Sequence, residues 1–223
     1  MGLWRKREQV ILWSTAYFPL LLIMVYRFVD SNDYFKKTKW GLWLGRQVDK
    51  TLFDLIVILG IISFSLLIYR LVSNWLFSDY DRQLKDKEIG KDISIRKYER
   101  ISVNDYSFFL MTLLLPLISI DHASVINFTV TFLIIVIIII IYVKTDYISV
   151  CPVFFISGRH LFKATISDQS RANEAINPLS RQKVIIITRD KSMNLNNKFR
   201  TEKLINNIYY VSNTSNNPST EGN

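Results

Sequence analysis

The chain has 223 residues, 49% of them apolar, and carries 28 lysines and arginines against 19 acidic residues. Its apolar residues are concentrated in long runs, and other stretches contain almost none. This segregation is typical of membrane proteins and argues against an ordinary soluble domain. A single cysteine, Cys151, excludes an intrachain disulfide and a cysteine-based zinc site.

Four apolar segments are predicted to be transmembrane helices, because a helix needs about 20 apolar residues to cross the hydrocarbon of a bilayer. They cover residues 10–26, 52–69, 104–120 and 123–143. At about 1.5 Å per residue the fourth would reach about 31 Å, whereas the apolar part of the third would reach only about 22 Å and needs shielding by its neighbours. No cleavage site follows the first segment, which is therefore interpreted as an uncleaved span.

The distribution of lysine and arginine predicts which side of the membrane each loop faces. The loop after the second span has seven basic residues between Arg82 and Arg100, the loop after the first span has six, and the turn between the third and fourth has none. Since cytoplasmic loops are enriched in lysine and arginine, we expect both termini and the middle loop to be cytoplasmic. The chain is thus predicted to be a multi-pass protein of the cell membrane.

The first external loop, residues 29–50, mixes aromatic side chains with lysines. Aromatic and cationic groups together favour the headgroup region of a bilayer, so this loop is expected to lie on the outer membrane surface. It is either a plain interfacial anchor or a sensor of disturbance of the envelope. For the second reading the candidate sensing residues are Tyr34, Phe35, Trp40 and Trp43.

After the fourth span the composition becomes more polar, and three strand-like runs appear at 160–167, 183–189 and 207–212. In the first run, apolar Phe162, Ala164 and Ile166 alternate with polar neighbours, which is the period of a half-buried strand. The predicted fold is therefore an α-helical integral membrane protein with four transmembrane helices and a small C-terminal cytoplasmic β-containing domain. The expected organisation is a transmembrane domain over 1–143, an interfacial helix and β domain over 144–212, and a disordered tail over 213–223.

No catalytic motif is recognisable in the sequence, and neither a metal nor a cofactor is expected. Ionisable residues near the spans have simple explanations. Asp54 is expected to favour a helix N-terminus, and Asp121 with His122 to form the turn between the third and fourth spans. The alternatives are an ion path through Asp54 and proton sensing at Asp121 and His122. The candidates for hydrogen bonds that join helices are Asn127, Thr129, Thr131 and Thr112.

The basic tail is the candidate partner-contact region. Its cations could meet anionic lipid, nucleic acid or an acidic protein surface, and no nucleic-acid recognition module is visible, so direct contact with nucleic acid is not predicted. The candidate contact residues are Lys163, Arg181, Lys183 and Arg189.

The segment from Asn104 to Lys163 resembles the membrane subunit of the bacterial Kiwa anti-phage defence system, the KwaA family. The resemblance lies in the stretch NDYSFFLMTLLLPLISID, the long aliphatic run ending in IYVK, and the stretch YISVCPVFFISGRHLFKA. Leu115-Pro116-Leu117, Pro152 and the run from Gly158 to Phe162 are the elements that match the family pattern. It covers about a quarter of the chain, together with the four-span arrangement.

The resemblance implies a non-enzymatic sensor and scaffold that forms a homo-oligomer in the lipid bilayer of the bacterial inner membrane. It also implies recruitment of a cytoplasmic, DNA-binding effector protein encoded in the same operon. The competing hypothesis is a small oligomeric channel or transporter, which would need polar residues along a path that the aliphatic fourth span hardly supplies. A membrane-embedded enzyme would need acids and histidines at one depth, a pattern that the sequence lacks.

Overall fold

The computed structural model describes residues 4–32, 49–102, 104, 106–107, 109–112, 124–167, 181–195 and 197–213. The chain divides into two compact units. The helical unit comprises residues 6–73 and 103–156, and the barrel unit comprises residues 1–5, 74–102 and 157–223. Each unit is therefore assembled from segments that are far apart in the sequence, with one helix, α3 (Lys50–Lys85), contributing to both.

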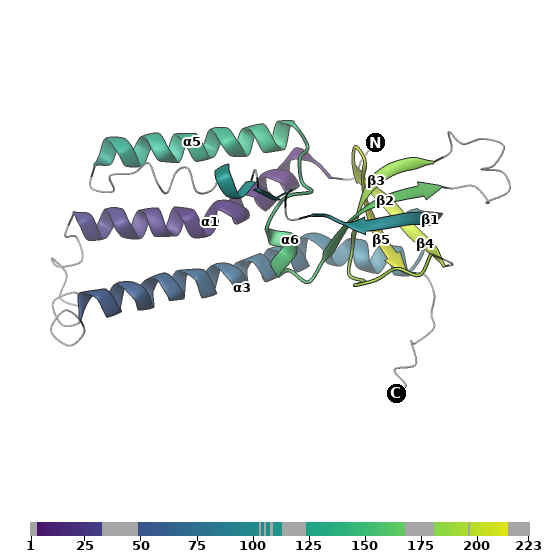
Figure 1. Ribbon diagram of the computed structural model, residues 1–223, viewed down its shortest axis with the longest axis horizontal. Helices are drawn as coiled ribbons and strands as arrows, with labels where there is room; N and C mark the ends of the chain where they lie inside the picture. Colours follow the sequence, from purple (N-terminus) through teal and green to yellow (C-terminus); the bar gives the residue numbers. More distant parts are fainter. Residues whose placement is uncertain are drawn as a thin grey trace. The chain divides into compact units, whose positions relative to one another are not determined.

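The helical unit contains α1 (Lys6–Ser31), the first part of α3, α5 (Val125–Lys144) and the short α6 (Val153–Ile156) (Figure 1). By length and composition α1, α3 and α5 can each cross a membrane. They contain the predicted first and second spans and most of the fourth. The predicted third span lies mostly outside the described residues, and its described part, 104–112 with gaps, is helical.

Apolar side chains cover the surface of α3 and α5 in the helical unit. Nine large apolar residues on this part of α3 and nine on α5 are exposed, among them Leu59 at 54% and Ile126 at 74%. Soluble proteins rarely expose apolar surface of this extent, because its contact with water is unfavourable. These two helices therefore have the surface expected of segments that face lipid or other apolar helices.

Aromatic side chains form the interior of the helical unit. Trp13 on α1 stacks on Tyr142 of α5 with 4.1 Å between ring centroids, and Phe109 lies against both rings. The hydroxyl of Thr112 is 3.1 Å from the hydroxyl of Tyr142. The expectation that Thr112 joins helices is thus confirmed. The backbone amide of Asn127 donates to the hydroxyl of Ser124, the N-cap of its own helix.

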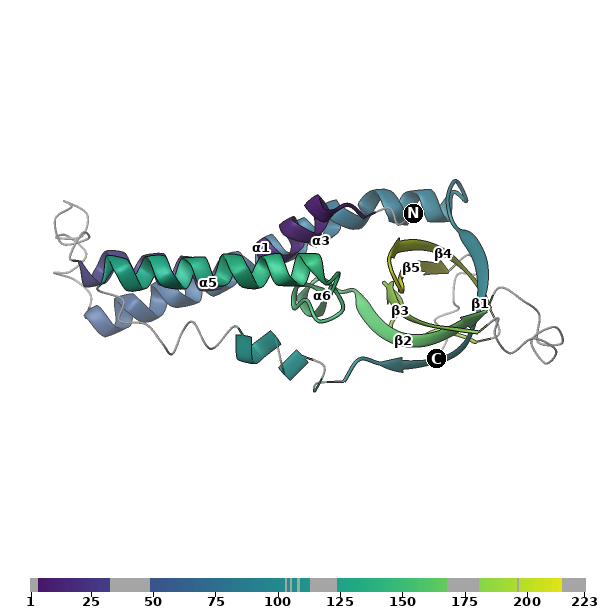
Figure 2. The same ribbon diagram turned by 90° about the horizontal axis from the view of Figure 1, so that it is seen from above.

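The barrel unit is a closed five-stranded barrel with the strand order β1-β2-β3-β5-β4 (Figure 2). All neighbouring strands are antiparallel except β3 and β5, which are parallel. Because the barrel is closed, every strand is hydrogen-bonded to a neighbouring strand on both of its edges. The strands are β1 (Lys91–Arg100), β2 (His160–Ser167), β3 (Gln182–Thr188), β4 (Lys198–Ile205) and β5 (Ile208–Asn213).

Two of the five strands were not expected from the sequence. The three predicted strands correspond to β2, β3 and β5, but β4 was missed, and the prediction of a loop between the second and third spans was wrong over residues 91–100. The reason lies in composition, because β1 (KDISIRKYER) has only Ile93 and Ile95 as aliphatic residues and otherwise reads as a charged loop. Pairing with β2 and β4 overrides that local preference.

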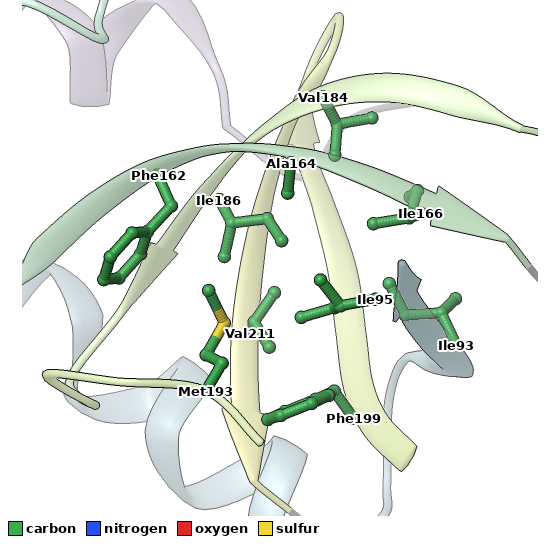
Figure 3. Close-up of a cluster of buried hydrophobic side chains, with 10 residues drawn as sticks. All are labelled: Ile93, Ile95, Phe162, Ala164, Ile166, Val184, Ile186, Met193, Phe199 and Val211. Atoms are coloured by element: carbon green, nitrogen blue, oxygen red, sulfur yellow. The ribbon is translucent and has the colours of Figure 1, made fainter. Parts of the chain in front are cut away.

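Side chains of alternating residues fill the barrel (Figure 3). The predicted alternation in β2 is confirmed, since Phe162, Ala164 and Ile166 all point inward while Lys163 between them is exposed. All five strands contribute to this core, and Met193 enters it from the connection between β3 and β4. Its members are Ile93, Ile95, Phe162, Ala164, Ile166, Val184, Ile186, Met193, Phe199 and Val211.

A tight turn carries the chain from the end of α3 into β1. Gly90 has a φ of +90°, and a Cβ atom there would lie 2.7 Å from the carbonyl oxygen of Thr201, so only glycine fits without a shift of the backbone. Arg200 on β4 holds the same turn by donating to the carbonyls of Lys87 at 3.0 Å and Ile89 at 2.7 Å. The turn thereby fixes where β1 enters the barrel.

Replacing Phe162 with alanine should unfold the barrel more readily than replacing its exposed neighbour. The ring of Phe162 is fully buried, and removing such a ring leaves a cavity that costs about 3–5 kcal/mol. Urea unfolding of the purified chain in mild detergent, followed by the circular dichroism of the strands, measures the loss. The matched control is Lys163→Ala, expected within about 0.5 kcal/mol of the original chain; equal effects of the two changes would contradict the inward position of Phe162.

Candidate functional site

The predicted site residues fall into three groups. The candidate sensing residues Tyr34, Phe35, Trp40 and Trp43 lie outside the described residues. Lys163 and Lys183 are exposed on the outer surface of the barrel, on β2 and β3, and Arg181 is exposed just before β3. Arg189, at the far end of β3, instead takes part in an ion pair with α3.

Three lysines from three adjacent strands gather on one outer face of the barrel. Strand register places Lys97 on β1 and Lys183 on β3 on either side of Thr165 on β2, in one row across the strands. Lys163 belongs to the next row, between Glu99 and Ile185. Because neighbouring strands are about 4.8 Å apart, the Cα atoms of Lys97 and Lys183 are about 10 Å apart. We call this surface the lysine face.

The lysine face is hollowed. A depression of about 500 Å³ is lined by the three lysines and by Glu99, Ala164, Thr165, Val184, Ile185 and Asn207. All of these residues belong to β1, β2 and β3 or to the turn before β5. Three ammonium groups against one carboxylate make its rim positive, so the hollow favours an anionic group.

A second cluster, the polar anchor, connects the end of α3 to the strands of the barrel. It consists of Asp81 on α3, Arg159 before β2, Arg189 after β3 and Tyr210 on β5. Arg189 lies 2.6 Å from one oxygen of Asp81, and Arg159 donates to the same oxygen at 3.3 Å. The hydroxyl of Tyr210 donates to the other oxygen. One carboxylate therefore holds groups from three places in the barrel unit.

Arg159 is the unusual member of the polar anchor, because its side chain is only 1% exposed. Its guanidinium lies 4.4 Å above the ring of Phe77 and 5.4 Å from that of Tyr210, and it also donates to the Tyr210 hydroxyl. A buried cation needs both an anion and further donors and acceptors around it. Asp81, Tyr210 and the two rings supply this environment.

The phenol of Tyr210 stays protonated in this setting. Burial raises its pKa above the ordinary value, although the charge of Arg159 opposes that rise. A protonated hydroxyl can donate to Asp81 while it accepts from Arg159, so it bridges the two charged groups. Next to it, Trp4 is 4% exposed and packs on Phe77 at 5.1 Å, and its backbone amide donates to Leu204 of β4.

Sequence reasoning missed the anchor. Asp81 lies in a stretch that was interpreted as a charged loop, and Arg159 lies in a stretch that was interpreted as part of a family motif. No local sequence pattern distinguishes these two residues from the exposed charged residues around them. Trp4 was also missed, because no local sequence pattern marks this tryptophan as a buried residue. The one available signal was the position of Asp81 one turn beyond the apolar run that ends at Phe77, which places it at the end of a continuing helix.

The described part of the chain shows no group of three or more histidine, cysteine and acidic side chains that could hold a metal ion. Cys151 is fully buried in the helical unit, with its sulfur 4.0 Å from the carbonyl oxygen of Leu12, and burial raises the pKa of its thiol. A protonated, enclosed thiol is a poor nucleophile. Its position agrees with the role of a small buried apolar residue.

Comparison with known proteins identifies a family. The model of a protein family described as anti-phage protein KwaA matches residues 8–210 of the chain. No protein with curated annotation and no solved structure matches it. The match extends over both units. It includes β1 to β4 completely and the first residues of β5.

The two charged partners in the anchor should respond differently to mutation. Asp81→Ala leaves Arg159 buried without its carboxylate, and such a loss costs about 3–5 kcal/mol. Arg159→Met keeps much of the side-chain volume and leaves Asp81 paired with Arg189 and Tyr210, so we expect less than half that loss. Urea unfolding of the two variants and of the double variant measures this order. A double variant as unstable as the sum of the single changes, or a milder effect for Asp81→Ala, would contradict the proposed geometry.

Proposed function

Because the chain belongs to the anti-phage KwaA family, we propose that it is a non-enzymatic membrane sensor and scaffold in bacterial defence against phage. In this proposal it oligomerises in the inner membrane, with both termini in the cytoplasm, and its barrel unit recruits a cytoplasmic DNA-binding effector encoded beside it. The family match supports the defence role. The remaining parts of the proposal are supported by the features described below.

The observation that carries the proposal is the composition of α3. Its first residues, from Leu52 to Leu71, expose apolar side chains, whereas its last turns carry Asp81 and belong to the barrel unit. One continuous helix of 36 residues thus contributes an apolar surface to one unit and an ionic contact to the other. Because the helix is continuous, a displacement of its apolar part can be transmitted along the helix to the residues that it contributes to the barrel unit. A membrane sensor requires such a connection.

Recruitment in this proposal uses the outer faces of the barrel. A partner strand cannot add to a closed barrel, since no strand keeps a free edge. Binding by strand addition, which an open three-stranded sheet would have allowed, is therefore replaced by contact with side chains. Lys163, Arg181 and Lys183 are exposed and remain the candidate contact residues, whereas Arg189 is held by Asp81 in the anchor.

Sensing is assigned to the external loop with Tyr34, Phe35, Trp40 and Trp43, on its aromatic and cationic composition alone. Oligomerisation is supported by the apolar surface of α5, which suits contact with further helices as well as with lipid. An oligomer would present several barrels to an effector and so strengthen a weak contact by multivalency.

The membrane part of the proposal is tested by extraction and by one outward-facing charge. The original chain should stay in the membrane fraction after alkaline washing and dissolve only with detergent. Ile137→Lys, near the middle of α5 at a position that is 55% exposed, should lower the inserted fraction, because a lysine at mid-bilayer costs about 2.5–3.5 kcal/mol. The control Lys198→Gln, on the barrel, should insert normally. A chain that is soluble without detergent would refute the proposal.

The scaffold part is tested by co-purification of the full chain with the protein encoded beside it. The isolated segment 145–223 is unsuitable for this test, because without β1 the barrel cannot close. The variant Lys163→Glu/Arg181→Glu/Lys183→Glu should lower recovery of the neighbour at least tenfold and weaken protection in a plaque assay. The control is Lys91→Glu/Lys198→Glu/Lys203→Glu, which changes charge equally on other parts of the barrel. If the original chain recovers no neighbour, the scaffold proposal fails.

A further inference from the structure

We propose that the lysine face of the barrel, formed by β1, β2 and β3, is a binding site for the phosphate backbone of single-stranded nucleic acid. This inference goes beyond the proposed function, because it concerns binding by the chain alone, although Lys163 and Lys183 are also candidate contacts for the effector. It also departs from the expectation drawn from the sequence, which showed no recognition module for nucleic acid. Three observations on the barrel unit carry it.

The first observation is the distribution of charge between the units. The barrel unit contains 18 lysines and arginines and 11 acidic residues, a net charge of +7. The helical unit contains the other 10 basic and 8 acidic residues, a net charge of +2, so most of the total of +9 belongs to the barrel unit. A field of this sign draws polyanions to a domain and speeds their association.

The second observation is the local geometry of the lysine face. Lys97, Lys163 and Lys183 stand on neighbouring strands around Thr165, at the rim of one hollow. All three are exposed at their residue positions, so their ammonium groups can reach an anion at the rim. A set of cations on adjacent strands can contact successive phosphates, and the Thr165 hydroxyl adds a hydrogen-bond donor between them.

The third observation is the strand order. A five-stranded Greek-key barrel with the order 1-2-3-5-4, closed between the first and fourth strands, is the arrangement of the OB-fold. Barrels of that arrangement bind oligonucleotides on the outer face around strands 2 and 3. Here the hollow with the three lysines lies on that same face. Topology and charge, two independent features, therefore indicate one surface.

The composition of the lysine face also predicts how the strand is held. The described lining of the hollow contains no aromatic residue, and Tyr98 on β1 packs against the barrel core. Binding should therefore depend on phosphate contacts and show little base preference. Glu99 within the hollow reduces the net charge and keeps the affinity modest.

The experiment uses the full chain in nanodiscs of zwitterionic lipid, so that anionic headgroups do not compete. A fluorescent 12-nucleotide single-stranded DNA is titrated, and its anisotropy gives the affinity at several salt concentrations. With three phosphate contacts and a slope of about −0.7 per contact, affinity should fall roughly 20-fold between 50 and 200 mM salt. Oligonucleotides of thymine and of adenine should bind alike.

The decisive variant is Lys97→Gln/Lys163→Gln/Lys183→Gln, which should weaken binding at 50 mM salt at least tenfold and flatten the salt dependence. The matched control Lys91→Gln/Lys198→Gln/Lys203→Gln removes the same charge from β1 and β4 and should bind within about twofold of the original chain. Thermal unfolding of both variants confirms that the barrel remains folded.

Three results would overturn the inference. These are absence of binding at 50 mM salt, equal loss in the two triple variants, and competition by a polyglutamate peptide as effective, charge for charge, as unlabelled single-stranded DNA. The last result would assign the lysine face to an acidic protein instead. None of these outcomes bears on membrane insertion, and recovery of the neighbour is measured separately by co-purification, so the two proposals can fail independently.

Discussion

Closure of the barrel around its apolar core is the constraint on which the other features of the barrel unit depend. Each strand has to satisfy backbone hydrogen bonds on both sides, and β1 does so for β2 and β4 at once. Without β1 both neighbours would present an open edge, and Ile93 and Ile95 would be missing from the core. The barrel therefore cannot be a C-terminal module that folds by itself, since one wall comes from the segment between the second and third predicted spans.

The polar anchor follows from the same constraint. Once β1 is part of the barrel, the preceding helix has to end beside the strands, and its last turns bring Asp81 and Phe77 into the barrel unit. Arg159, at the entrance to β2, is buried between these residues and Tyr210. Breaking such a buried contact on one side is costly, whereas replacing the whole cluster with apolar residues often is not. We therefore explain the charged residues of the polar anchor by the specific position that they give to the last turns of α3, and not by stability alone.

How much of this was accessible from the sequence differs between the two units. The three long apolar helices could be predicted because long aliphatic runs are a local property, and the run from Leu133 to Ile141 is entirely aliphatic. The alternation in β2 was equally local. Closure, by contrast, depends on pairs such as Ile95 with Ile166 and Asp92 with Arg200, which are more than 70 residues apart. Neither the lysine face nor the anchor is visible before that pairing is known, because Lys97 and Lys183 become neighbours only across Thr165.

The two units differ in surface chemistry, and this difference explains how a chain with no recognisable catalytic motif can take part in defence. Exposed apolar residues on α3 and α5 restrict where the chain is stable, and the basic barrel restricts what it can bind. A closed barrel offers side chains and no backbone edge, so its contacts are chosen by charge and shape and not by strand pairing. Such contacts are individually weak, depend on salt and form quickly. They suit reversible binding of the anionic partner that we propose.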